Sequence, residues 1–224
     1  MKITTNTFYC DNYNDIIIKN HKLVMEKFDI DINYHKITTR HGMFMDHICR
    51  NIDADVFVFF DPDCVPLTRS IYEDSLKYII KYNTFLGAAQ VSNHISPYVH
   101  VFAAPCFFMI TKDCYESLGS PSFLETPRSD VAEEVSYVAE TKNKKYKCIY
   151  PTRYESIPNG SVYRCSNYGD YGIGTLFGDK IYHLFESRFD KYTDLYTSRC
   201  NQILNDEFDK STMISSTELS VNNV

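Results

Sequence analysis

The pattern of apolar and polar residues predicts strands and helices that alternate through the first part of the chain. Apolar residues recur at helical spacing after Asp11 or Asn12, either of which is the expected helix cap. Strand-like runs stand on both sides of this helix and again after a second helix. The predicted order is strand 2–10, helix 13–28, strand 33–38, a helix from His41, and strand 56–60. This order is typical of a parallel sheet with right-handed crossovers.

The last of these strands, Val56–Phe60, consists of Val and Phe without a polar break, which predicts a strand buried on both faces. Two carboxylates follow at once, Asp61 and Asp63, separated only by Pro62. Burying an unpaired carboxylate costs several kcal/mol, so both acids are expected at the carboxyl end of the strand. Residues two positions apart on an extended chain project from the same side. One interpretation is a turn; the other is a pair of oxygen ligands for Mg²⁺ or Mn²⁺.

The rest of the pattern predicts two more buried strands and two more helices. In the segment SDVAEEVSYVAETK, Asp130 stands where a helix cap is expected, and Glu133 follows three residues later, as in a capping box. The predicted elements are helix 71–82, strand 84–91, strand 100–111 and helix 129–142. We therefore expect an α/β fold, a single domain with a mostly parallel central sheet and helices on both faces. Residues 205–224 are expected to form a polar tail after the domain at 1–204.

Glycines are concentrated in one segment late in the chain. Four of the eight lie in YGDYGIGTLFGDK, between Gly169 and Gly178, just before a short apolar stretch that contains His183. Glycine gives the backbone unusual freedom, so a loop is predicted here. The spacing matches neither a Walker loop nor a dinucleotide-binding fingerprint. A surface loop is the simpler interpretation, and a mobile loop that closes over a diphosphate is the functional one.

The composition favours a soluble protein with reduced cysteines. A chain of 224 residues can form one large domain with a sizeable core. The net charge of −6 offers no broad attraction to nucleic acid or to an anionic membrane surface. Eight cysteines are scattered without a CxxC pair, and no apolar run approaches the length of a membrane span. The expected location is the cytoplasm, or the host cytoplasm if a virus encodes the chain.

The order of these features resembles that of the GT-A glycosyltransferases over about residues 2–190. The resemblance rests on an α/β first half, a DxD at Asp61 and Asp63, the acidic segment SDVAEE, and a late histidine in IYHLFESR. It implies a nucleotide-sugar-binding half over 1–92 and an acceptor and catalytic half over 93–204. It also implies transfer of a sugar from a nucleotide-sugar, with a UDP-sugar as the expected donor, to a hydroxyl group. Mn²⁺ or Mg²⁺ would lie between the DxD and the diphosphate.

The resemblance also implies roles for single residues. Asp63 is the expected main metal ligand, Asp61 would hold the donor ribose or the water shell of the metal, and His183 matches the late metal-binding histidine. A lone histidine at a strand end is also commonly structural. Three basic residues flank the glycine-rich segment and could reach a phosphate, with solvated surface as the alternative: Arg164, Lys180 and Arg188.

In inverting members of the family, a carboxylate near the start of the mid-chain helix removes the proton of the acceptor hydroxyl. Asp130, Glu133 and Glu134 compete for this role, and Asp130 is favoured over the other two. The alternative for Asp130 is a helix cap with Glu133 closing a capping box. A retaining enzyme would need no such base.

The segment RHGMFMD matches the region where the family contacts the nucleotide base and ribose. His41, Gly42 and Asp46 are therefore expected donor contacts, although each also suits the start of a helix. The chain contains no Trp, so a QxxRW motif is absent and a processive polysaccharide synthase is disfavoured. The acceptor is expected to be a glycan, a small molecule or another hydroxyl-bearing substrate, and the negative net charge disfavours a nucleic acid acceptor.

Two other functions fit the same residues. A hydrophobic strand followed by DPDCV is similar to the first motif of haloacid-dehalogenase-type phosphatases, in which Asp61 would be the nucleophile and Asp63 the acid/base. That family normally carries the motif on its first strand and adds a later acidic pair, whereas FGDKIYH offers only Asp179. The third interpretation is an inactive GT-A-like module that binds a nucleotide or a glycan.

Overall fold

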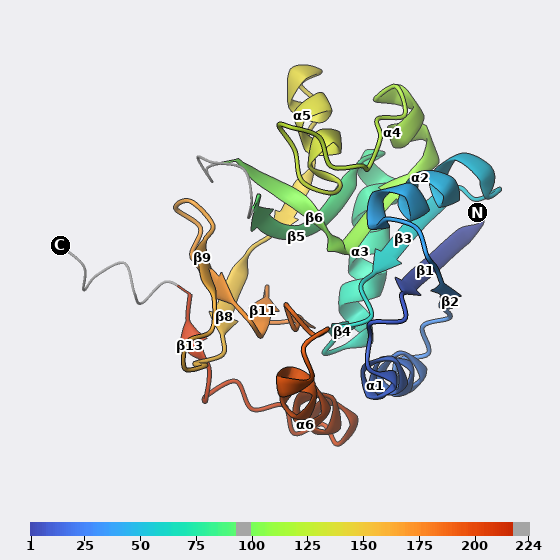
Figure 1. The fold of residues 1–224 in the computed structure, drawn as a ribbon. Helices are drawn as coiled ribbons and strands as arrows, with labels where there is room; N and C mark the ends of the chain where they lie inside the picture. Colours follow the sequence, from blue (N-terminus) through green and yellow to red (C-terminus); the bar gives the residue numbers. More distant parts are fainter. Residues whose placement is uncertain (93–99, 217–224) are drawn as a thin grey trace.

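A six-stranded sheet forms the centre of the computed structural model, which describes residues 1–92 and 100–216. The strand order is β2, β1, β3, β6, β5 and β7 (Figure 1). Five of these six described strands run in one direction, and β6 is antiparallel to both neighbours. The predicted α/β class with a mostly parallel sheet is confirmed. The strands are β1 (Ile3–Tyr9), β2 (Asn33–Lys36), β3 (Val56–Phe60), β5 (Phe85–Val91), β6 (Val101–Thr111) and β7 (Lys147–Ile149).

Helices cover both faces of this sheet because β3 sends apolar side chains to both sides. Phe57 and Phe59 pack in one core cluster, and Val56, Val58 and Phe60 pack in another. All five residues of β3 are buried, as the unbroken apolar run predicts. The first cluster includes residues of α2 (His41–Asn51), α4 (Lys112–Ser117) and α5 (Glu133–Thr141), and the second includes residues of α3 (Arg69–Tyr82) (Figure 1).

The chain passes directly from β3 of the first sheet into a second, antiparallel sheet of five strands. β3 ends at Phe60 and β4 begins at Cys64, so residues 61–63 form the link between the two sheets. The strand order is β13, β8, β11, β12 and β4. The strands are β4 (Cys64–Pro66), β8 (Pro151–Tyr154), β11 (Thr175–Phe177), β12 (Ile181–His183) and β13 (Ile214–Ser215).

Two helices from opposite ends of the chain pack together against the second sheet. Ile17 and Val24 of α1 (Asp15–Lys27) share a core cluster with Tyr196 and Cys200 of α6 (Thr193–Leu204), which follows the short helix η1 (Asp190–Tyr192) (Figure 1). The cap of α1 differs from the expected Asp11 or Asn12. Asn14 fills this position, and its side chain accepts a hydrogen bond from the N–H of Ile16 at 3.0 Å.

The glycine-rich segment is two short strands rather than the predicted loop. Asp170–Gly172 forms β10, which pairs with β9 (Val162–Arg164), and β11 follows at once. At Gly174 a Cβ atom would lie 2.4 Å from Cγ of Glu155 and 2.5 Å from the hydroxyl of Tyr182. Glycine is therefore needed at this position because the surrounding side chains leave no room for a Cβ atom. From the sequence alone, a glycine needed for close packing looks the same as a glycine needed for a flexible loop.

The described part of the expected polar tail packs on the second sheet. β13 pairs with β8 at its edge, and the carbonyl of Asp209 accepts a hydrogen bond from Nη1 of Arg199 at 2.7 Å. Residues 217–224 lie outside the described residues. None of the helices in the described ranges combines the length and apolar character that a membrane span requires.

Candidate functional site

The two aspartates of the DxD are held by main-chain hydrogen bonds at the junction of the sheets. The N–H of Asp61 donates to the carbonyl of Cys106 in β6 at 2.9 Å, and the carbonyl of Asp61 accepts from the N–H of Cys64 at 3.0 Å. The carbonyl of Asp63 accepts from the N–H of Leu184, which follows β12, at 3.0 Å. Elements of both sheets therefore position the acidic segment.

His183 reaches the acidic pair because β12 pairs with β4. In the antiparallel register His183 lies opposite Cys64, the residue after Asp63. Nε2 of His183 is 3.3 Å from Oδ1 of Asp63. One ligand atom from each of Asp61, Asp63 and His183 lies within 4.8 Å of the others. The structure thus brings together the three residues expected to form a metal site.

The chemistry of this group fits a divalent cation. Oδ1 of Asp61, Oδ1 of Asp63 and Nδ1 of His183 are buried and have no hydrogen-bond partner within the described part of the chain. Buried polar atoms normally have partners, and carboxylates with an imidazole are common metal ligands. Burial and the neighbouring Asp63 raise the pKa of the Asp61 carboxyl well above its usual range. A bound cation would offset both effects, because it favours the ionised carboxylates.

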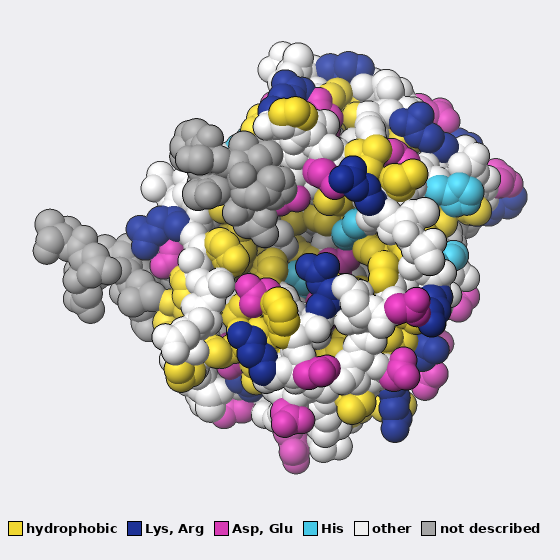
Figure 2. Space-filling view, in the orientation of Figure 1, with side chains coloured by type: hydrophobic (Ala, Val, Ile, Leu, Met, Phe, Trp, Pro, Cys, Tyr) yellow, Lys and Arg dark blue, Asp and Glu magenta, His cyan; other side chains and the backbone are white. Residues whose placement is uncertain are grey.

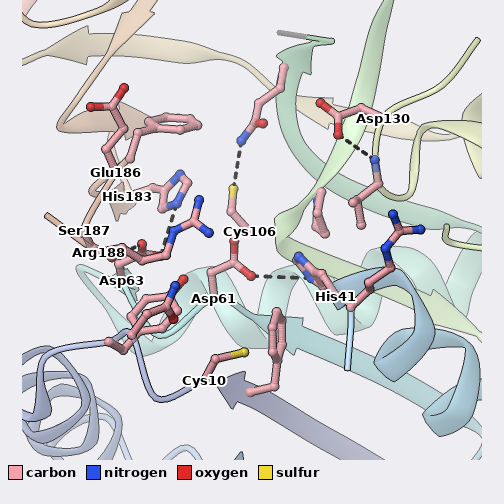
Figure 3. Close-up of a pocket in the computed structure, with 18 of the residues that line it drawn as sticks. Cys10, His41, Asp61, Asp63, Cys106, Asp130, His183, Glu186, Ser187 and Arg188 are labelled. Carbon is pink, nitrogen blue, oxygen red and sulfur yellow. Dashed lines mark hydrogen bonds and ion pairs between the residues drawn. The ribbon is translucent and has the colours of Figure 1, made fainter. Parts of the chain in front are cut away.

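The three residues line a pocket of about 420 Å³. Figure 3 shows His183 and Arg188 on one side of the acidic pair and His41 on the other. The space-filling view shows a hollow near the middle of this face, with histidine side chains inside it and basic side chains at its edge (Figure 2). The lining is Phe8, Cys10, Asn12, Tyr13, Thr39, Arg40, His41, Asp61, Asp63, Gln90, Phe102, Pro105, Cys106, Asp130, Val131, His183, Phe185, Glu186, Ser187 and Arg188.

Of the three residues expected to contact the nucleotide, His41 lines the pocket. Its Nε2 is 3.6 Å from Oδ1 of Asp61, and its ring centroid is 4.3 Å from that of Phe8. Burial lowers the pKa of the imidazole to about 3, despite the opposing influence of Asp63, so His41 is neutral at physiological pH.

Gly42 and Asp46 hold the segment after α4 and are not among the lining residues. A Cβ on Gly42 would lie 2.5 Å from the carbonyl oxygen of Phe123, so glycine allows the close approach of α2 to this segment. Asp46 accepts hydrogen bonds from the hydroxyl of Ser122 at 2.6 Å and from the N–H of Phe123 at 3.1 Å. In this structure both residues have packing roles.

Of the three carboxylates proposed as the base, Asp130 lines the pocket. Glu133 is 1% exposed and contacts His100, and Glu134 forms an ion pair with Arg128. Neither glutamate is among the described lining residues. The helix start also differs from the expectation, because α5 begins at Glu133 and its cap is Ala132 rather than Asp130.

Several pocket residues were not anticipated from the sequence. The hydroxyl of Ser187 donates to Oδ2 of Asp63, and Nε2 of Gln90 donates to the thiol of Cys106 at 3.3 Å. Burial alone would raise the pKa of the Cys106 thiol, but the neighbouring Cys64 thiol and His183 lower it to about 5. One signal was available for this region: Pro105 interrupts a buried run, and proline within a sheet commonly marks a bulge. The β5–β6 register does shift there, next to Cys106.

No family model and no curated protein matches the sequence. Among solved structures, A197 from STIV is similar with 14% identity and a TM-score of 0.41, over 81% of this chain and 93% of that chain. The 4-diphosphocytidyl-2C-methyl-D-erythritol synthase of Anaerococcus prevotii matches with 12% identity and a TM-score of 0.41, over 66% and 88%. A putative glucose-1-phosphate thymidylyltransferase of Bacillus anthracis matches with 7% identity and a TM-score of 0.40, over 65% and 86%. These distant likenesses assign no reaction or substrate to the chain.

Proposed function

We propose that this protein is a metal-dependent glycosyltransferase that transfers a sugar from a nucleotide-sugar, with a UDP-sugar as the expected donor, to a hydroxyl acceptor. The observation that carries the proposal is the convergence of Asp61, Asp63 and His183 in a pocket that Asp130 also lines. The GT-A resemblance supplies the reaction class, because it relates the same residues to a donor, a metal and a base.

The roles of the binding residues follow from their chemistry. Asp61, Asp63 and His183 would hold Mg²⁺ or Mn²⁺, which when bound offsets the charge that develops on the leaving diphosphate. The hydroxyl of Ser187 donates to Oδ2 of Asp63 and so orients this carboxylate, which leaves Oδ1 for the metal. Arg188 lines the same pocket, where its guanidinium can donate hydrogen bonds to phosphate oxygens.

Asp130 is the proposed base of an inverting reaction. It lines the pocket, and a carboxylate there can accept the proton of an acceptor hydroxyl. One of its oxygens, Oδ1, accepts a hydrogen bond from the N–H of Val131 at 2.7 Å, which limits how the carboxylate can turn. Neutral His41 lies beside Asp61 and is available for hydrogen bonds to the donor.

The test is a mass-spectrometric assay of a panel of nucleotide-sugars with hydroxyl acceptors in the presence of Mn²⁺ or Mg²⁺. We expect release of a nucleoside diphosphate and formation of a glycosylated product by the wild-type chain. Asp63→Asn should lower turnover by at least about 100-fold, because it removes a charged ligand. The matched control is Asp74→Asn, which alters an exposed aspartate paired with Lys77 and should leave turnover unchanged.

Other outcomes, in this assay or in a parallel assay with a phosphomonoester as the substrate, would contradict the proposal. Turnover that persists in the presence of a chelator, or in Asp63→Asn, would exclude the metal role. Hydrolysis of phosphomonoesters with an acyl-phosphate at Asp61 would indicate a phosphatase, and donor binding without turnover would indicate a binding module. Release of a sugar 1-phosphate, with the nucleoside monophosphate transferred to the acceptor, would indicate nucleotidyl transfer, the kind of reaction that the name thymidylyltransferase gives to the similar Bacillus anthracis structure.

A further inference from the structure

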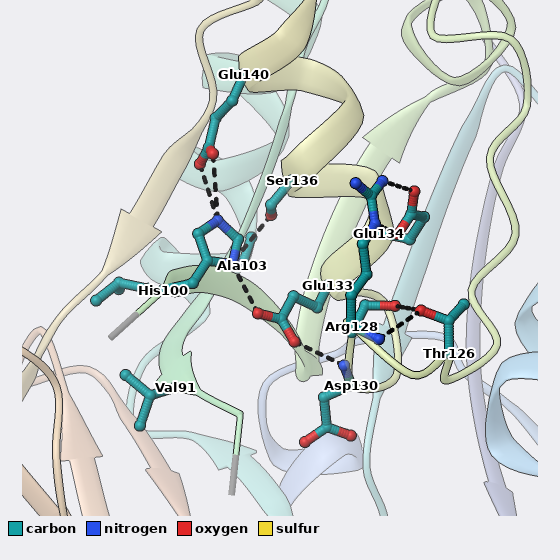
Figure 4. Close-up of polar contacts among 12 residues, drawn as sticks. Val91, His100, Ala103, Thr126, Arg128, Asp130, Glu133, Glu134, Ser136 and Glu140 are labelled. Carbon is teal, nitrogen blue, oxygen red and sulfur yellow. Dashed lines mark hydrogen bonds and ion pairs between the residues drawn. The ribbon is translucent and has the colours of Figure 1, made fainter. Parts of the chain in front are cut away.

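A buried carboxylate behind the pocket wall holds the main chain of Asp130. Oε2 of Glu133 accepts a hydrogen bond from the N–H of Asp130 at 2.6 Å, and the N–H of Glu133 donates to the carbonyl of Asp130 at 3.1 Å. The other oxygen of Glu133, Oε1, is 2.7 Å from Nδ1 of His100 (Figure 4). Both oxygens of this carboxylate are therefore engaged, one with the Asp130 backbone and one with an imidazole.

His100 joins two glutamates that lie on one face of α5. Its Nε2 is 3.1 Å from Oε1 of Glu140, and its ring stacks on that of Tyr137 with the centroids 3.9 Å apart. Glu133, Tyr137 and Glu140 are spaced by four and three residues, so they occupy one side of the helix. The imidazole, at the start of β6, thus fastens the beginning of α5 to the central sheet (Figure 4).

The burial of the Glu133 carboxylate explains why its contact with His100 is needed. The side chain of Glu133 is 1% exposed, and burying a carboxylate at that depth is costly unless it is paired and hydrogen-bonded. His100 supplies the partner. Burial opposes protonation of this imidazole, but its hydrogen bonds to Glu133 and Glu140 raise its pKa above the ordinary value. Figure 4 shows the carboxylate of Asp130 pointing away from that of Glu133.

The backbone that Glu133 secures is not regular helix. Ala132 has a φ of 67°, a conformation that costs energy for a residue with a Cβ atom and persists only where the surroundings impose it. The N–H of Ala132 donates to the carbonyl of Phe123 at 3.0 Å. Asp130 therefore lies two residues before a strained residue, in a turn that is held by Glu133 from within and by the carbonyl of Phe123 from outside.

We propose that Glu133, paired with His100, is a positioning residue that sets the rate of the reaction by holding Asp130 at the pocket wall. The inference rests on the proposed function, in which Asp130 accepts the proton of the acceptor. Proton removal is sensitive to displacements of the base well below the size of an atom, whereas donor binding depends on the metal group. Loss of this contact should therefore lower kcat and leave the KM for the donor unchanged.

The experiment compares Glu133→Ala with Glu133→Gln in steady-state assays with the metal and the donor. Glutamine can accept from the Asp130 N–H through its carbonyl oxygen and donate its amide to Nδ1 of neutral His100. We expect Glu133→Ala to lower kcat about 100-fold with the donor KM within about twofold of wild type, and Glu133→Gln to recover kcat to within about threefold. His100→Phe, which keeps a ring on Tyr137 but loses both hydrogen bonds, should also lower kcat.

The matched control is Glu73→Ala, which removes a half-buried glutamate of α3 that pairs with Arg69 far from the pocket lining, and it should leave kcat unchanged. Metal-dependent stabilisation by the donor, measured on each variant, shows that the pocket is still folded. Wild-type kcat in Glu133→Ala, a change confined to KM, or no recovery in Glu133→Gln would overturn the positioning role while the proposed function stands. A wild-type chain that turns over no nucleotide-sugar would overturn the proposed function, and this inference with it.

Discussion

At the scale of single residues, the surroundings of His100 favour its protonated, positively charged form. Its imidazole is 18% exposed, stacks on Tyr137, and lies between the carboxylates of Glu133 and Glu140. Burial lowers its pKa, and the two carboxylates outweigh burial, so the folded-state pKa is raised. A group with a raised folded pKa stabilises the protein fully below its unfolded value of about 6.5, and the stabilisation is lost as the pH rises through the folded pKa.

We therefore predict that the stability difference between wild type and His100→Phe shrinks as the pH is raised from about 6 to about 9. The free energies of unfolding are to be measured by urea denaturation at each pH. His47→Phe, at an exposed histidine of α2, is the control and should show no such trend. A difference that stays constant over this range would show that the two carboxylates do not hold the proton on His100.

At the scale of elements, a buried ion pair ties α6 to Glu155, the residue that follows β8. Nε and Nη2 of Arg199 donate to the two oxygens of Glu155 at 2.7 and 3.1 Å, and both side chains are at most 8% exposed. Removing one member of such a pair leaves a buried charge without a partner. We predict that Arg199→Ala lowers the free energy of unfolding by about 3–5 kcal/mol in denaturant titrations.

The double variant Arg199→Met with Glu155→Met is the matching control. It removes both charges and keeps similar volume, so its stability should lie within about 2 kcal/mol of wild type. A double variant as unstable as Arg199→Ala would mean that other contacts of the guanidinium, which lies over the ring of Phe208, matter more than the pair with Glu155.

At the scale of the whole molecule, the pocket is shared by elements distant in the chain: the ends of β1 and β3, a bulge of β6, the loop before α5, and the segment after β12. A ligand that contacts all of them binds only the folded state. At about 100 times its dissociation constant, the donor should add about 2.7 kcal/mol and raise the melting temperature by roughly 5–10 °C. The shift should require Mn²⁺ or Mg²⁺ and disappear in Asp63→Asn.

This prediction is checked by thermal unfolding with the donor alone, the metal alone, and both together. An equal shift of the melting temperature without the metal would show that the donor binds without help from Asp61, Asp63 and His183. Asp74→Asn should retain the full shift, because Asp74 lies on the exposed side of α3.

Much of the first sheet was predictable because its signals are local. The order of β1, α1, β2, α2 and β3 follows from apolar spacing, and the placement of Asp61 and Asp63 follows from the cost of burying carboxylates. The errors have a common origin. A cluster of glycines, such as that at 169–178, can reflect either a loop or close packing, and the contacts around Gly174 show that packing is the cause there. An acidic residue before a helix can be a cap or can point elsewhere, and the structure places the cap of α5 at Ala132.

Hydrophobic burial and the exclusion of charge act within a few neighbouring residues, so the fold class and the position of two acids at the end of a buried strand could be predicted from the sequence. The tertiary structure decided which other residues meet these acids. Ser187 is 124 positions from Asp63, and His183 arrives through the pairing of β12 with β4. It also decided that Asp130 lines the pocket while Glu133 turns to His100, because strand pairing and loop packing depend on the whole chain at once.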